Sequence, residues 1–314
     1  MKRLSLGTLL FIATQSIGYA QESGTNQLPV VIQSILNTFL QVTNTPGPTF
    51  NIYSATDDTS HSYTRNRAPT FLGNTIGGTG MDLTAIPVWD NWDSPPPTGS
   101  NPYGGARFNG ILVTPDILLQ AHHPWAGSGF SPQTIYFVDN NNQTVARTVS
   151  GHESVTGTDI EVVRLTKEVP STVTPALVFA TDALPHKTGI PVLWTDQFRE
   201  LYIGVGVLAN NDSILVYQAS TNTLFHAYWA TAHNGVVSGD SGAPYMTVIN
   251  NRLVAMGTWT SGGATRGGGS SFAGQVSAIN TAITSLGSTT SLQTIDASGS
   301  PKVIQNSPPN PRFR

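Results

Sequence analysis

The sequence predicts an all-β protein. From about residue 68 onward, short runs of apolar and β-branched residues alternate with turn residues, and no helical stretch separates them. The 31 glycines and 21 prolines among 314 residues supply the many turns that such a fold needs. Strands at this spacing favour a sandwich or barrels, because a parallel α/β sheet would need helices between its strands.

Individual elements can be placed from local patterns. The run Asp139 to Asn142 has the composition of a hairpin tip. The spacing of apolar residues from Val276 to Leu286 predicts a short C-terminal helix, which Gly287 would cap. The clearest strand candidates are Gly110–Val113, Thr134–Val138, Ile160–Leu165, Tyr202–Leu208 and Leu253–Met256.

The N-terminus has the pattern of a secretory signal peptide. Lys2 and Arg3 precede a mostly apolar stretch from Leu4 to Ile17, and small residues follow up to Ala20. A membrane anchor is the alternative, but residues 14–16 interrupt the stretch, which is too short to span a bilayer. We therefore expect residues 1–20 to be removed and the protein to be secreted, to a periplasm or outside the cell, without a membrane partner afterwards.

Four regions are expected along the chain. Residues 1–20 form the signal peptide, and residues 21–67 form an N-terminal extension with a helix over Leu28–Leu40. This extension is either a propeptide or a helix packed on the main domain, and the sequence does not decide between them. Residues 68–287 form the main domain, divided near residue 175. Residues 288–314 are expected to form a flexible tail, with four prolines after Ser298.

Composition excludes several function classes. The formal net charge is −3 and no cluster of Lys and Arg is present, which argues against a nucleic-acid partner. The chain has no cysteine, so disulfides cannot form. No His-Glu-x-x-His string or similar spacing indicates a metal site, although His122 and His123 are adjacent.

One serine lies in a context suited to nucleophilic catalysis. A serine hydroxyl needs an imidazole to take its proton, a carboxylate to orient that imidazole, and backbone N–H groups for the developing oxyanion. Glycines flank the Asp240–Ser241 pair in the string from Ser238 to Pro244, so the backbone there can turn sharply. The expected oxyanion donors are the N–H groups of Gly239 and Ser241. Alone, the string could also be an ordinary turn.

Two further strings supply the partners. Gln120-Ala121-His122-His123 follows an apolar run, and Asp159 opens the strand candidate Ile160–Leu165. The chain order is therefore His, Asp, Ser. An α/β-hydrolase would run Ser, Asp, His and a subtilisin-like enzyme would start from Asp, so neither fits.

Together, these strings resemble the chymotrypsin-like serine peptidases over roughly Phe108 to Leu286. The resemblance implies Ser241 as nucleophile, His123 as general base and Asp159 as the orienting carboxylate. A one-residue slip of register would make His122 the base instead.

The chain departs from the family pattern at several positions. Ala243 replaces a second glycine, Gln120 replaces Thr and His122 replaces Ala in the family's Thr-Ala-Ala-His string. Glu161 stands where the family prefers a small apolar residue, which predicts that this face of the strand meets solvent.

The resemblance also implies a fold and a substrate site. The fold would be two six-stranded antiparallel β-barrels with a short C-terminal helix. Substrate would contact Ser238 and the segment Thr258, Trp259 and Thr260, and Gly235 would form the floor of the specificity pocket. Since Gly235 carries no charge, uncharged side chains are expected at the cleaved bond.

The expected activity is that of a secreted serine endopeptidase. It would hydrolyse peptide bonds through a Ser-His-Asp triad and an acyl-enzyme, as a monomer, with a protein or peptide substrate and with neither metal nor cofactor. One alternative is a catalytically inactive relative that binds proteins. Another is an unrelated carbohydrate-binding β-sandwich using some of the six Trp and nine Tyr residues.

Overall fold

The structure is a computed structural model. It describes side chains at residues 82–87, 110–126, 134–180, 192–195, 240–249, 252–262 and 267–295. Backbone strands alone are described at 50–51, 53–57, 62–65, 189–191, 200–210, 213–218, 266 and 301–303. The predicted signal peptide, the predicted helix over Leu28–Leu40 and the nucleophile string before Asp240 lie outside the described residues.

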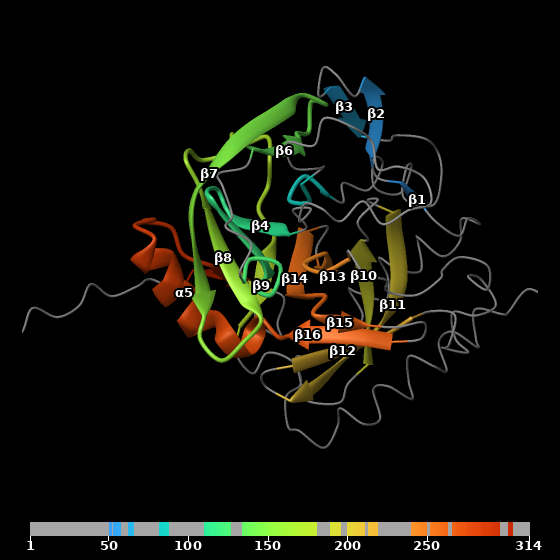
Figure 1. The fold of residues 1–314 in the computed structure, drawn as a ribbon. Helices are drawn as coiled ribbons and strands as arrows, with labels where there is room; N and C mark the ends of the chain where they lie inside the picture. The colour runs from blue at the N-terminus through green and yellow to red at the C-terminus, as the bar shows by residue number, and fades with distance from the viewer. Residues whose placement is uncertain are drawn as a thin grey trace, which may run out of the picture.

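The first sheet has five antiparallel strands in the order β4-β5-β8-β7-β6. Strand β8 is central, with β5 on one side and the long, strongly bent β7 on the other (Figure 1). The five strands are β4 (Ile111–Thr114), β5 (Ile117–Ala121), β6 (Thr134–Val138), β7 (Thr144–Val155) and β8 (Ile160–Leu165).

The predicted hairpin tip joins β6 to β7. The carboxylate of Asp139 accepts hydrogen bonds from the backbone N–H groups of Asn141 and Gln143, at 2.8 and 2.7 Å. Asn142 has a φ of 60°, a conformation that asparagine tolerates better than most residues. The prediction of a turn at this position is confirmed.

The second sheet contains eleven strands, and all of them except β1 follow β8 in the chain. Its neighbours are antiparallel except that β9 runs parallel to both β14 and β17. The strands are β1 (Phe50–Asn51), β9 (Leu177–Phe179), β10 (Gly189–Thr195), β11 (Glu200–Asn210), β12 (Ser213–Gln218), β13 (Pro244–Ile249), β14 (Arg252–Thr258), β15 (Ser261–Gly262), β16 (Arg266–Ser270), β17 (Gln293–Ile295) and β18 (Pro301–Val303). A separate hairpin pairs β2 (Tyr53–Asp57) with β3 (Ser62–Arg65).

A short helix, α5 (Val276–Ser285), follows the second sheet and packs against β7 and β8 of the first (Figure 1). Its end has the geometry of a Schellman cap. Gly287 has a φ of 76°, and the N–H groups of Gly287 and Ser288 donate to the carbonyls of Thr284 and Ile283 at 2.9 and 3.2 Å. The predicted helix and its glycine cap are confirmed.

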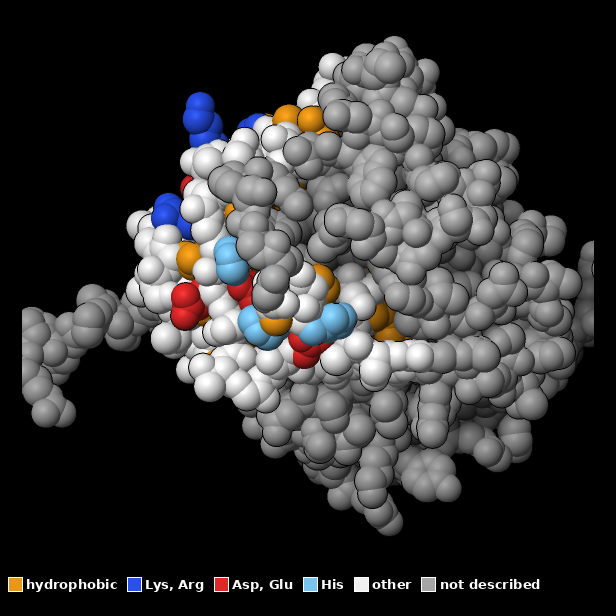
Figure 2. Space-filling view, viewed as in Figure 1, with side chains coloured by type: hydrophobic (Ala, Val, Ile, Leu, Met, Phe, Trp, Pro, Cys, Tyr) orange, Lys and Arg blue, Asp and Glu red, His pale blue; other side chains and the backbone are white. Residues whose placement is uncertain are grey.

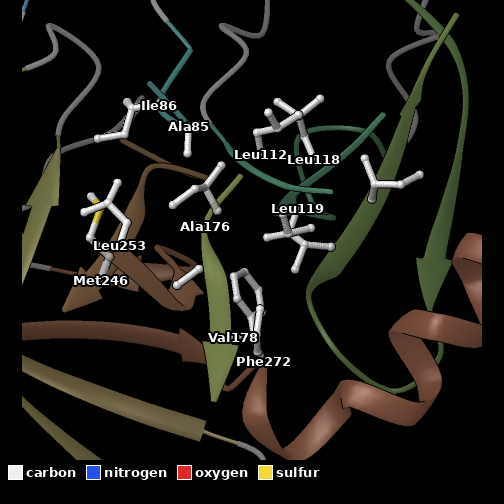
Figure 3. Close-up of a cluster of buried hydrophobic side chains, with 14 of the residues drawn as sticks. Ala85, Ile86, Leu112, Leu118, Leu119, Ala176, Val178, Met246, Leu253 and Phe272 are labelled. Atoms are coloured by element: carbon white, nitrogen blue, oxygen red, sulfur yellow. The ribbon is translucent and has the colours of Figure 1, made fainter. Parts of the chain in front are cut away.

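A hydrophobic core joins the two sheets. Figure 3 shows Leu118 and Leu119 of β5 on one side and Val178 of β9 and Leu253 of β14 on the other, with Phe272 below. All of these side chains are buried. Burying one such side chain contributes about 1.5–3 kcal/mol, so this shared core holds the sheets against each other.

The predicted all-β class is confirmed, since the described residues are mostly strands with one short α-helix. The expectation of two six-stranded barrels stays a prediction. Among the described residues, no helix is both long and apolar enough to cross a membrane.

The prediction that the flexible tail begins at residue 288 is wrong. Residues 288–295 pack on the body of the protein, where Leu292 and Ile295 are buried and β17 pairs with β9. Leu292 and Ile295 are isolated apolar residues in a Ser- and Thr-rich segment. They give no periodic signal, so the sequence did not predict their burial. The C-terminal segment therefore connects both sheets, through α5 on the first and β17 on the second.

Candidate active site

Ser241 lies on a tight turn just before β13. Gly242 has a φ of 82°, a left-handed conformation that glycine adopts without strain. The N–H of Ala243 closes the turn on the carbonyl of Asp240 at 2.9 Å. The N–H of Gly242 donates to the carbonyl of Trp259 at 2.9 Å, and the N–H of Trp259 donates to the carbonyl of Ala243 at 3.0 Å. The turn is thus fixed to the end of β14.

His123 lies just beyond the end of β5, in a turn held by Asp159. The N–H of His122 donates to the backbone carbonyl of Asp159 at 3.1 Å, and the N–H of His123 donates to its Oδ1 at 2.7 Å. The carbonyl of His122 accepts from the N–H groups of Trp125 and Ala126 at 2.8 and 3.3 Å. These bonds fix the backbone on both sides of His123.

The imidazole of His123 bridges the carboxylate and the hydroxyl. Its Nδ1 is 2.8 Å from Oδ2 of Asp159, and its Nε2 is 2.7 Å from Oγ of Ser241. The side chain of His123 is 44% exposed and that of Asp159 is 17% exposed, so the carboxylate lies behind an accessible ring. Figure 2 shows histidine and acidic side chains gathered on one face, on the side where the first sheet lies in Figure 1.

Asp159 is held in its charged form. Burial alone would raise the pKa of its carboxyl group, but the side chain of His123, the nearby Thr260 hydroxyl and the N–H of His123 together lower that pKa below its ordinary value. Thr260 lies close enough to Asp159 to contribute to this lowering of the pKa. A charged Asp159 keeps the proton of the neutral ring on Nδ1, which leaves the Nε2 lone pair facing Ser241.

The two adjacent histidines have different partners. His123 contacts Asp159 and Ser241, whereas Nδ1 of His122 lies 2.6 Å from Oε2 of Glu161. Of the two possible registers, the one that aligns His123 with the general base matches this geometry.

The expectation that Glu161 meets solvent is wrong. The Glu161 side chain is only 1% exposed, and its second oxygen, Oε1, lies 2.5 Å from Nδ1 of His152. The reason is its position: β8 is the central strand of its sheet, and two imidazoles from the flanking segments cover the carboxylate. Strand alternation alone could not reveal these partners.

The predicted substrate-binding residues divide into two groups. Gly235, Ser238 and the predicted oxyanion donor Gly239 lie outside the described residues. Thr258 and Trp259 are both 1% exposed, and Thr260 is half-buried beside Asp159. The backbone of Trp259 contacts the turn that carries Ser241, while its ring packs against Trp194 and Tyr245.

Sequence reasoning missed two residues near the triad. Ser270, at the end of β16, accepts a hydrogen bond from the N–H of Asp159 at 3.1 Å and so links the second sheet to the carboxylate. His152 lies on β7, in register with Val163 of β8. No local motif marks either residue. His152 is brought near by the pairing of β7 with β8, and Ser270 by the packing of the second sheet against the first.

Within the described ranges, no group of three or more His, Cys, Asp or Glu side chains is arranged to hold a metal ion. No protein-family model matches the sequence, and no curated protein is significantly similar to it.

Proposed function

We propose that this protein is a secreted serine endopeptidase that hydrolyses peptide bonds through Ser241, His123 and Asp159. One observation carries the proposal: a single imidazole bridges a carboxylate and a serine hydroxyl at 2.8 and 2.7 Å. The three residues come from separate segments, so their convergence is a property of the fold. Hydrogen bonds of this length at both ring nitrogens are what activation of a serine requires.

In the proposed reaction, Oγ of Ser241 attacks the carbonyl carbon of the substrate while Nε2 of His123 takes the hydroxyl proton. Asp159 stabilises the imidazolium that forms and remains ionised. The tetrahedral intermediate collapses when His123 gives its proton to the leaving amine, which leaves an acyl group on Ser241. Water, deprotonated by His123, then attacks the acyl carbon. Oγ of Ser241 leaves and takes that proton back from His123, which releases the acid product and restores the enzyme.

The oxyanion of the intermediate would be bound by backbone N–H groups. The left-handed Gly242 and the bonds that fix the turn to Trp259 support a rigid backbone around Ser241. The N–H groups of Gly239 and Ser241 are the proposed donors. The absence of a charge at Gly235 is the basis for proposing uncharged side chains at the cleaved bond.

The wider architecture belongs to the same proposal. We propose two six-stranded barrels with the triad between them. One antiparallel sheet carries His123 and Asp159 and a second sheet carries Ser241, which supports this arrangement. Secretion rests on the N-terminal pattern of residues 1–20.

Labelling by a fluorophosphonate probe tests the proposal directly, because the probe reacts with an activated serine. We expect the mature protein to be labelled and Ser241→Ala to be unlabelled. Ser154→Ala, on the exposed face of β7, is the matched control and should be labelled like the wild type.

The same probe distinguishes the roles of His123 and His122. His123→Ala should lose labelling by a factor of about 10⁴–10⁶, as expected for removal of a general base. His122→Ala should retain much more. A mature wild-type protein that folds but is never labelled would contradict the proposal and would favour a binding role instead.

A further inference from the structure

Three residues that depart from the pattern of chymotrypsin-like peptidases meet in one cluster. Gln120 of β5 and Glu161 of β8 are directly paired across the sheet, and His122 follows β5 by one residue. Gln120 and Glu161 are each 1% exposed. The three departures therefore share one location next to the triad and are not scattered over the surface.

The carboxylate of Glu161 is held at both oxygens. Oε2 lies 2.6 Å from Nδ1 of His122, and Oε1 lies 2.5 Å from Nδ1 of His152. A buried carboxylate without partners is costly, so Glu161 strongly favours the arrangement in which both rings turn their Nδ1–H groups toward it. The two histidines are 38% and 41% exposed, and Glu161 therefore decides how two otherwise accessible rings are oriented.

Trp125 closes the cluster from the other side. Its Nε1–H donates to Oε1 of Gln120, and its ring packs on that of His152, with ring centroids 4.4 Å apart. Trp125 is 5% exposed and its backbone N–H donates to the carbonyl of His122. The turn after β5 is thus attached to the first sheet by its backbone, by the Trp125 ring and by the His122 ring.

We propose that Glu161 is a positioning residue for the catalytic base, acting through His122; this inference rests on the proposed function. His122 and His123 are consecutive, and their side chains bind different partners: His122 binds Glu161, whereas His123 binds Asp159 and Ser241. Each histidine of this dipeptide is therefore held by its own carboxylate. Holding His122 restricts the backbone rotation that would carry the His123 ring away from Ser241.

A purely space-filling role would not need these residues. A small apolar side chain at position 161, with alanine at 122, would fill the sheet without burying a charge. The chain has instead a carboxylate and two imidazole partners, which together impose an orientation as well as filling space.

The experiment combines kinetics with a spectroscopic measurement on the mature protein. Glu161→Gln is nearly isosteric and removes the charge. We expect its kcat to fall about 10- to 100-fold while its KM stays within about threefold of the wild type. The far-downfield proton resonance of the His123 Nδ1–H, which reports its hydrogen bond to Asp159, should weaken or shift.

A double-mutant cycle tests whether Glu161 acts through His122. We expect Glu161→Ala combined with His122→Ala to lower kcat no more than Glu161→Ala alone, because the two residues share one interaction. Should Glu161→Ala fail to fold, Glu161→Gln with His122→Ala gives the same cycle. Glu153→Gln, at an exposed position of β7, is the matched control and should change neither kcat nor the resonance.

Each outcome bears on the proposal. Unchanged kcat and an unchanged resonance in Glu161→Gln would overturn it, and so would effects of Glu161 and His122 that simply add. The resonance does not depend on turnover, so it tests positioning even if the wild type hydrolyses nothing. A protein without activity, whose His123 resonance still depends on Glu161, would refute the proposed function and keep the positioning role.

Discussion

Nε2 of His123 lies 2.7 Å from Oγ of Ser241, although 118 positions separate the two residues in the chain. His123 follows β5 of the first sheet, whereas Ser241 precedes β13 of the second, so this contact spans the two sheets. Its length depends on how the sheets pack as well as on the local turns.

The variant Asp159→Asn tests the tautomer that the carboxylate imposes. An amide can still accept from the N–H of His123, but it presents an NH₂ group to Nδ1 and drives the ring proton to Nε2, facing Ser241. We expect kcat to fall about 10⁴-fold with little change in the melting temperature. Steady-state kinetics and thermal unfolding measure the two effects. Glu153→Gln serves as control, and a loss of less than tenfold in Asp159→Asn would contradict the assigned role.

The lowered pKa of the Asp82 carboxyl group predicts how the free energy of unfolding depends on pH. Burial raises the pKa of Asp82, but hydrogen bonds from Thr174, Thr84 and Asn140 outweigh it, so the native pKa is lowered. The unfolded chain therefore binds more protons as the pH falls, and the stabilisation present above the ordinary Asp pKa is lost as the pH passes down through the lowered native value.

Urea unfolding at a series of pH values between about 5 and 2 checks this dependence. We expect the free energy of unfolding of the wild type to fall more steeply with acidification than that of Asp82→Asn. Parallel curves for the two proteins would show that the contacts of Asp82 do not supply the effect.

Substituting two left-handed glycines separates the cost of backbone strain from the effect on Ser241. Gly242 has a φ of 82° beside Ser241, and Gly287 has a φ of 76° at the end of α5. Alanine at either position should lower the free energy of unfolding by about 1–2 kcal/mol. Only Gly242→Ala should also slow labelling of Ser241, since it distorts the nucleophile turn. Equal labelling rates for both variants, measured with the fluorophosphonate probe, would argue against a special role for this turn.

A polar cluster around Asp116 fixes the C-terminal segment to the first sheet. Oδ1 of Asp116 accepts from the hydroxyls of Thr114 and Thr290 at 3.0 and 2.8 Å, and Oδ2 lies 3.6 Å from Nε of Arg164. Arg164 also donates to the carbonyl of Leu286. Asp116→Ala removes the acceptor that these groups share and should cost about 1–3 kcal/mol in chemical denaturation. Glu168→Ala, at an exposed position, should change stability by no more than about 0.5 kcal/mol.

Local patterns were sufficient for the elements that do not depend on distant partners. The strand over Ile160–Leu165 and the helix from Val276 were predicted because periodicity and capping residues act within a few positions. Ser241 and Asp159 could be selected as candidates because glycine-rich turns and strand starts have local signatures. The same reasoning misplaced the start of the tail, because Leu292 and Ile295 are buried by contacts with the second sheet rather than by a pattern of their own.

The turn that carries Ser241 was determined by the sequence itself, through the glycines that flank Asp240 and Ser241. Only the tertiary structure decided which of the two adjacent histidines contacts Asp159 and Ser241. It also decided the burial of Glu161 and the positions of His152 and Ser270. The physical reason is that contacts between residues far apart in the chain depend on how the two sheets pack, as for His123 and Ser241. Within one sheet they depend on which residues stand opposite each other across neighbouring strands, as for Glu161 and His152. A shift of one residue in that pairing turns every side chain to the other face, and no local pattern records it.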